Sequence, residues 1–163
     1  MDAPAPSAPS PWPSPNPALT HALIGSILAA QGFAPAQDTT TTRPWKLTEF
    51  DRCADWIASA LKGGDLTLAE VRDGVRADWF QLFSAPDGVM VTEFLLSPRL
   101  RAVHVLAAGG TLRAMQELTP KVEAFARMAG CTHGGATGRK GWVRWLRRLG
   151  YAPSPLTTVE KVL

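Results

Sequence analysis

Apolar residues from position 48 onward recur at spacings that predict helices and strands in alternation. The run from Thr48 to Leu61 has apolar residues at helical spacing, and Gly63-Gly64 ends it, so it predicts one helix. Thr67-Leu-Ala-Glu70 is a capping-box sequence, in which the threonine hydroxyl and the glutamate carboxylate each satisfy a backbone donor. It predicts a second helix that runs to about Asp78.

Three segments of strand-forming residues come next, and turn residues separate them. The segments are 79–84, 89–96 and 100–107, and the turns are Pro86-Asp-Gly88 and Ser97-Pro-Arg99. Because short turns join antiparallel neighbours, we expect three consecutive antiparallel strands.

A long helix is predicted after Gly109-Gly110, since apolar residues recur at helical spacing from Leu112 to Ala126. Pro120 lies in its middle. A proline there removes a backbone hydrogen bond and clashes with the preceding turn, so we expect a kink or a break near Thr119.

The remaining sequence predicts a short strand within 131–137, a basic helix that ends at Gly150-Tyr151, and a last strand over 156–163. The apolar positions of that helix fall on one stripe that is expected to be buried, namely Trp142, Trp145 or Leu146, and Leu149. Its arginines at 144, 147 and 148 are expected to face solvent.

The N-terminal part differs in composition from the rest. Seven prolines among residues 1–17 exclude helix and sheet, so we expect an extended or disordered tail there. Residues 18–31 predict a helix with an apolar stripe and few charges, which suits a helix lying on a protein surface, either its own domain or a partner. The predicted organisation is therefore a Pro-rich tail (1–17), a docking helix with a linker (18–42) and one domain (43–163).

Charge and cysteine content narrow the function classes. The net charge is only +3, and the basic residues are concentrated locally, with five of them within 139–148, so this charge balance argues against a nucleic-acid partner. Cys53 and Cys131 lie far apart and form no metal-binding spacing, so we expect reduced cysteines and no metal.

The longest apolar run, 22–30, is shorter than the roughly 20 residues that span a bilayer. A signal peptide requires a Lys or Arg near its start, but no Lys or Arg precedes Arg43. We therefore expect a cytoplasmic protein.

The order of these elements resembles that of the GNAT N-acetyltransferase superfamily. The resemblance covers roughly 43–163 and is carried by the strands, Gly-rich turn and helix of 79–129 and by the closing segment Arg139-Lys-Gly-Trp-Val-Arg-Trp-Leu-Arg-Arg-Leu-Gly-Tyr151. It implies an α/β (α+β) fold with a mostly antiparallel mixed sheet flanked by helices. More narrowly, Gly138-Arg-Lys-Gly-Trp142 is similar to the compact GNAT-like proteins of phages and phage-derived gene clusters.

The resemblance also implies a place for the cofactor. The family holds the pyrophosphate of acyl-CoA at a glycine-rich turn before the long helix, where backbone N–H groups and the helix dipole favour an anion. Here the spacing is shorter and the leading Gln or Arg of the family motif is absent, and the alternative is a plain turn. The candidate residues for acetyl-CoA or another acyl-CoA are Gly109, Gly110, Thr111, Leu112 and Arg113.

Catalytic groups are expected on the central strands and the closing helix. Glu93 and His104 are the candidates for the base that accepts the proton of an amine; the alternatives are a solvated or salt-bridged carboxylate and a satisfied sheet histidine. Many family members use a tyrosine to protonate the leaving thiolate, but that position falls on Leu146. Tyr151, the only tyrosine, is expected to be packed instead.

Two functions are therefore carried forward. The first is a GNAT-like N-acetyltransferase that transfers an acyl group from acyl-CoA to an amine. The second is a non-catalytic GNAT-like structural or interaction protein of a phage or phage-derived particle, docking through residues 18–31.

Overall fold

The computed structural model describes residues 44–97, 100–138 and 140–153. The predicted tail, docking helix and last strand lie outside these residues. None of the helices in the described part is long and apolar enough to cross a membrane.

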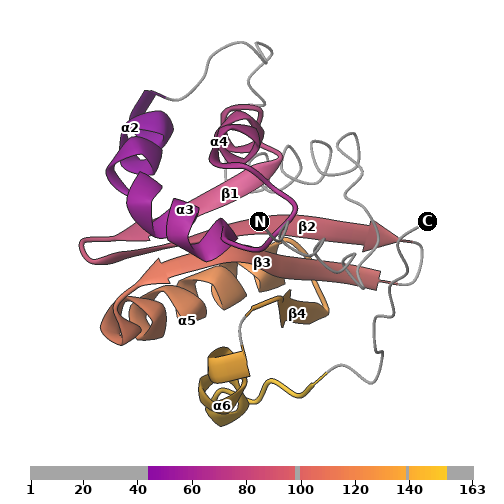
Figure 1. The fold of residues 1–163 in the computed structure, drawn as a ribbon. Helices are drawn as coiled ribbons and strands as arrows, with labels where there is room; N and C mark the ends of the chain where they lie inside the picture. Colours follow the sequence, from indigo (N-terminus) through magenta and orange to yellow (C-terminus); the bar gives the residue numbers. More distant parts are fainter. Residues whose placement is uncertain (1–43, 98–99, 139, 154–163) are drawn as a thin grey trace, which may run out of the picture.

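The described residues form five helices and one mixed sheet (Figure 1). The sheet has the order β1-β2-β3-β4, with β1, β2 and β3 antiparallel and β4 parallel to β3. In chain order the elements are α2 (Pro44–Arg52), α3 (Ala54–Leu61), α4 (Leu68–Arg76), β1 (Phe80–Ala85), β2 (Gly88–Ser97), β3 (Leu100–Gly110), α5 (Leu112–Met128), β4 (His133–Ala136) and α6 (Lys140–Arg148). The three predicted antiparallel strands and the short fourth strand are confirmed.

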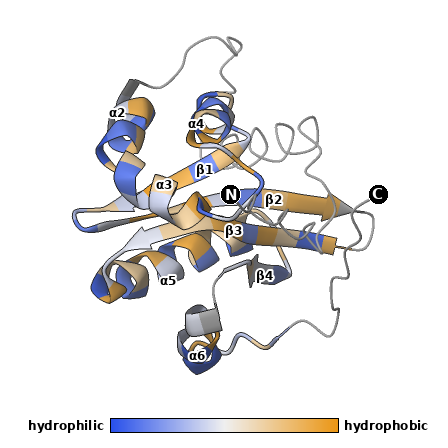
Figure 2. Cartoon of the chain, in the orientation of Figure 1, coloured by the Kyte–Doolittle hydropathy of each residue, from blue (hydrophilic) through white to orange (hydrophobic). Residues whose placement is uncertain are grey.

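Helices cover both faces of the sheet, and a separate core lies on each. Helices α2, α3 and α4 lie on one face, and α5 and α6 on the other (Figure 1). On the first face Ile57 and Val75 pack with Val91 of β2, and on the second Leu118 packs with Phe94. Figure 2 shows the central strand β2 as mostly apolar, as expected for a strand covered on both sides.

The single helix predicted for 48–61 is wrong, because two helices occupy this stretch. Helix α2 already begins at Pro44, since proline is favoured in the first turn of a helix. Cys53 separates α2 from α3 with a non-helical backbone (φ −96°, ψ 2°). Its side chain is fully buried between the two, so the burial pattern continues across the turn and hides the break.

The capping box predicted for the next helix is confirmed. The backbone N–H of Glu70 donates to Thr67 Oγ1 (3.2 Å), and the backbone N–H of Thr67 donates to Glu70 Oε2 (2.8 Å). Two donors at the start of α4 are thereby satisfied, which explains why this short helix begins at Leu68.

Helix α5 continues without the expected break at Pro120. The proline lies on the exposed side of the helix, as does Gln116, whose carbonyl loses its helical donor. Solvent can satisfy a carbonyl on that side. On the buried side the Thr119 hydroxyl donates to the carbonyl of Met115 (2.8 Å), so the polar group there is also paired.

The closing helix α6 is amphipathic, as predicted, with one exception. Trp142 and Trp145 pack against the α5 core and against each other, edge to face at 5.7 Å. Leu149 was expected on the same stripe but is 42% exposed, because it lies beyond the last helical residue. The arginines at 144, 147 and 148 are exposed.

The turn between β3 and α5 depends on glycine. A Cβ at Gly110 would lie 2.3 Å from the carbonyl oxygen of Asp87 and 2.4 Å from the Cα of Gly88, and the residue has a φ of +114°. We predict that Gly110→Ala lowers the free energy of unfolding by more than about 2 kcal/mol, measured by urea denaturation.

Gly141 is the matched control, because it lies in α6 with open space around its Cα and an ordinary φ. Gly141→Ala is expected to be neutral or to stabilise the fold by up to about 1 kcal/mol, as alanine is the better helix former. Equal effects of the two substitutions would contradict this account of the turn.

Candidate functional site

The site lies where β3 and β4 stop pairing. Strand β4 pairs with β3 only over Ala102–Val105, whereas β3 continues to Gly110. A bulge follows immediately: Thr92 of β2 lies opposite Val105 and Val91 opposite Ala107, so Leu106 is an extra residue in β3. Bulges of this kind often lie next to active sites, because they change where side chains and backbone groups point.

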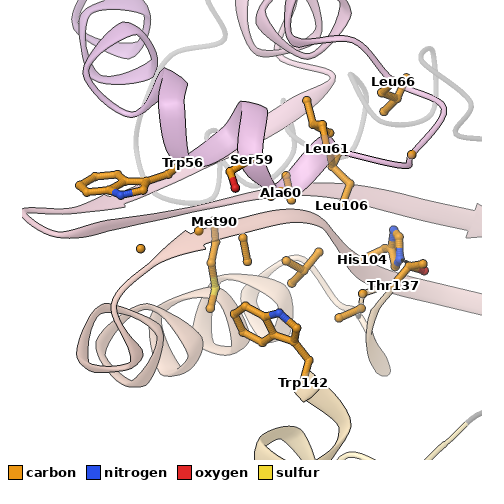
Figure 3. Close-up of a pocket in the computed structure, with 18 of the residues that line it drawn as sticks. Trp56, Ser59, Ala60, Leu61, Leu66, Met90, His104, Leu106, Thr137 and Trp142 are labelled. Carbon is orange, nitrogen blue, oxygen red and sulfur yellow. Dashed lines mark hydrogen bonds between the residues drawn. The ribbon is translucent and has the colours of Figure 1, made fainter. Parts of the chain in front are cut away.

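A pocket of about 1100 Å³ opens at this unpaired edge. It extends around β3 from α3 on one face to α6 on the other, as Figure 3 shows with Trp56 and Trp142 on opposite sides of the strand. Leu61 and Leu106 contribute apolar wall, and His104 is among the few polar groups. A largely apolar pocket with a small number of polar groups is the usual form of a small-molecule site.

Glu93 and His104 are brought together by the register of the β2–β3 hairpin. The two residues are direct partners across the strands, and Glu93 Oε1 lies 3.0 Å from His104 Nδ1. The histidine is only 4% exposed. Both predicted base candidates therefore lie in one pocket and contact each other, which residue type alone did not reveal.

Thr137 completes this arrangement and was missed by the sequence analysis. It directly follows β4, and its Oγ1 lies 3.0 Å from His104 Nε2 (Figure 3). Because β4 runs parallel to β3, with His104 opposite Gly135, the chain leaving β4 passes the histidine. Only the pairing of two strands far apart in the sequence places Thr137 there, and no local pattern signals it.

The partners of His104 assign its neutral tautomer. A carboxylate can only accept a hydrogen bond, so Nδ1 carries the proton and donates to Glu93. Nε2 is then an acceptor, and the Thr137 hydroxyl donates to it. The result is a chain of two hydrogen bonds from a carboxylate through an imidazole to a hydroxyl.

The cofactor-binding candidates gather at the end of β3 and the start of α5. Thr111 caps α5 by accepting from the backbone N–H of Ala114 (3.2 Å), while Leu112 and Arg113 form its exposed first turn. Gly109, Gly110 and Thr111 line the pocket.

These glycines also have a packing role. A Cβ at Gly109 would lie 2.7 Å from the carbonyl oxygen of Trp56 in α3, and Gly110 is needed for the turn described above. The Thr111 backbone N–H donates to the carbonyl of Asp87 (3.0 Å) and its hydroxyl to the Asp87 carboxylate (2.5 Å). A negative charge therefore already lies at the N-terminus of α5, where helix dipoles favour anions.

Leu146 and Tyr151 both lie in the pocket wall. Leu146 has no ionisable group. The Tyr151 hydroxyl donates to Glu123 Oε1 at 3.3 Å. Burial raises the pKa of the Tyr151 phenol to about 12, with the neighbouring Glu123 carboxylate adding to the shift. Tyr151 is therefore packed, as expected from the sequence, and its phenol is neutral at physiological pH.

In the described ranges, no three His, Cys, Asp or Glu side chains lie close enough to hold a metal ion. Cys53 and Cys131 are free thiols, and burial raises the pKa of both. Neither thiol has the lowered pKa of a reactive cysteine.

Comparison with solved structures identifies the fold. An acetyltransferase of Trypanosoma brucei is similar with a TM-score of 0.54 and 10% identity, over 71% of this chain and 94% of its own. A Clostridium difficile protein named a possible acetyltransferase is similar with a TM-score of 0.54 and 9% identity, over 72% and 93%. The protein TTHA1254 of Thermus thermophilus has a TM-score of 0.53 and 22% identity, over 74% and 95%.

At these identities the likeness establishes the fold alone. The predicted α+β fold, a mixed sheet flanked by helices as in acetyltransferase-like (GNAT) proteins, is confirmed. No family model matches the sequence, and no curated protein matches it either.

The packing of Tyr151 in the pocket wall can be tested directly, because this residue is the only tyrosine in the sequence. We predict that, as the pH is raised, the tyrosinate absorbance of the folded protein appears with a midpoint at a pH of about 12, the pKa of Tyr151. In denaturant the midpoint should return to about 10, the ordinary tyrosine pKa. The raised pKa means that folding favours the neutral phenol of Tyr151. The stability that this phenol contributes is therefore complete below pH 10 and is lost as the pH rises through 12.

Glu123→Gln separates the two causes. It should lower the midpoint only in part, because burial is the larger cause of the shift. A folded protein that ionises at the ordinary tyrosine pKa would show that Tyr151 does not pack here.

Proposed function

We propose that this protein is an acyl-CoA-dependent N-acyltransferase whose reaction takes place in the pocket between β3 and β4. One observation carries the proposal: His104 is buried on a central strand, is oriented by Glu93 and lies in a pocket large enough for a cofactor. The likeness of the fold to acetyltransferases supports it.

The unpaired edge of β3 suits the donor. Beyond Val105 no strand among the described residues pairs with this edge, so backbone groups of 106–110 face the pocket side of the sheet. The arm of CoA that carries the thioester contains amide groups, which can pair with such an edge as an added strand does. The acyl group is then carried toward His104, which lies one residue before the last paired position of β3 and β4.

Acyl transfer from a thioester requires few chemical groups of the protein. Acyl transfer from a thioester to an amine needs the two reactants held together and a base that takes the proton of the amine. His104, with its tautomer set by Glu93, is the base of the site. Leu146 supplies no acid for the leaving thiolate, so that proton comes from another source.

The phosphate end of the donor is assigned to the first turn of α5. Leu112 and Arg113 are exposed there, and Arg113 supplies a positive charge. The Asp87 carboxylate opposes an anion at the same place, because it is hydrogen-bonded to Thr111 at the cap. Binding of the cofactor is therefore expected to be weakened by this one residue.

Isothermal calorimetry with acetyl-CoA tests the assignment. Asp87→Asn should tighten binding by about two- to five-fold, because one charge near a helix N-terminus is worth about 0.3–1 kcal/mol. Arg113→Glu should weaken it by at least as much. Arg148→Glu is the matched control, since Arg148 is an exposed arginine at the far end of α6 and should leave the affinity unchanged.

The absence of binding at millimolar acetyl-CoA in both the wild type and Asp87→Asn would overturn the proposed function. Binding that is unaffected by Asp87→Asn and Arg113→Glu would retain the cofactor but contradict its placement at α5.

A further inference from the structure

The two nitrogens of His104 are both occupied. Nδ1 is held by Glu93 and Nε2 by the Thr137 hydroxyl, each at 3.0 Å. The nitrogen that would accept a proton from a bound amine therefore already accepts one hydrogen bond from the protein itself. A base in this state acts first on the hydroxyl that it contacts.

The atoms in this chain are those by which a histidine activates a hydroxyl nucleophile: carboxylate to Nδ1, and Nε2 to hydroxyl. We propose that Thr137 is a nucleophile that receives the acyl group as an ester before it is passed on. The proposal rests on the pocket of the proposed function, and it deepens that function by adding a covalent step.

Exposure supports the same assignment. His104 is buried and the Glu93 side chain is 13% exposed, whereas Thr137 is exposed and lies in the pocket wall. Of the three groups, the hydroxyl is the one presented to a substrate. Thr137 also directly follows the last residue of β4, at the point where the two strands diverge.

Thr132 provides a contrast within the same segment. Its hydroxyl lies 2.8 Å from His133 Nδ1, so it too is a threonine in contact with a histidine. Both residues are exposed, and His133 has no carboxylate partner among the residues that the structure describes. This pair lacks both the orienting group and the pocket, so it serves as a control.

The proposed reaction has two balanced steps. In the first, Thr137 Oγ1 attacks the thioester carbonyl carbon while its proton passes to His104 Nε2, and the Glu93 carboxylate stabilises the imidazolium. The carbon–sulfur bond breaks, and His104 returns the proton to the thiolate, which leaves as a thiol. In the second, an amine attacks the ester carbonyl, its proton passes to His104 Nε2 and then to Thr137 Oγ1, and the amide is released.

This sequence accounts for the absence of an acid at Leu146. The proton that the thiolate needs is the one that His104 took from Thr137, so no tyrosine on α6 is required. Water in place of the amine in the second step gives hydrolysis, and the same residues serve.

The test uses the full chain and p-nitrophenyl acetate, an acyl donor that contains no CoA. We expect release of p-nitrophenol with transfer of one acetyl group to the protein, found by mass spectrometry of the acid-quenched protein and mapped to residue 137. Thr137→Ser should retain the label, and Thr137→Ala should lose it. His104→Gln and Glu93→Gln should slow labelling, His104→Gln by about 10²-fold or more, the usual effect of removing a general base.

Thr132→Ala should be labelled at the wild-type rate. The proposal is overturned if the wild type is not labelled, if the acetyl group lies on another residue, or if Thr137→Ala is labelled like the wild type. If Thr137 only orients His104, no ester forms at position 137. Any acetyl group would then lie on another residue, and Thr137→Ala would be labelled like the wild type.

Calorimetry keeps the two proposals apart. Binding of acetyl-CoA without any ester on Thr137 would leave the acyltransferase in place with direct transfer to the amine. An ester on Thr137 without binding of acetyl-CoA would leave the nucleophile in place and overturn the proposed donor.

Discussion

Strand β3 is eleven residues long and its parallel neighbour β4 only four, and the site depends on this mismatch. Pairing holds the two strands together as far as Val105, after which the chain of β4 turns away toward α6. Backbone donors and acceptors of β3 beyond that point have no strand partner on this side among the described residues, and such groups are a template for a further extended segment. The bulge at Leu106, the pocket and the turn into α5 all lie along this one edge.

The polar groups lie near the end of this pairing, at His104, one residue before the last paired position. Antiparallel pairing places Glu93 beside His104, and parallel pairing brings Thr137 to the other side of the ring. Burying a charged or polar group is costly unless its hydrogen bonds are made, and here each ring nitrogen has a partner. The same two contacts that satisfy the buried histidine also set its tautomer and direct the Nε2 lone pair to the Thr137 hydroxyl.

Local signals made much of the fold predictable, and non-local contacts explain what was missed. The Thr67 cap, the strand turns and the long helix depend on neighbouring residues, so the sequence displays them. The turn at Cys53 was hidden because burial is continuous across it. In the site, residue type pointed to Glu93 and His104, while Thr137 and Asp87 reach their places only through the pairing of distant segments.

We propose that an acyl donor lies along the unpaired edge of β3 with its carbonyl at Thr137. A crystal structure with a thioether analogue of acetyl-CoA, which has the carbonyl but cannot transfer it, tests this claim most directly. We expect to find the analogue in the pocket, with its carbonyl carbon in contact with Thr137 Oγ1 and its phosphates at the first turn of α5. An analogue bound elsewhere, or bound in the pocket with its carbonyl away from Thr137 and His104, would contradict it.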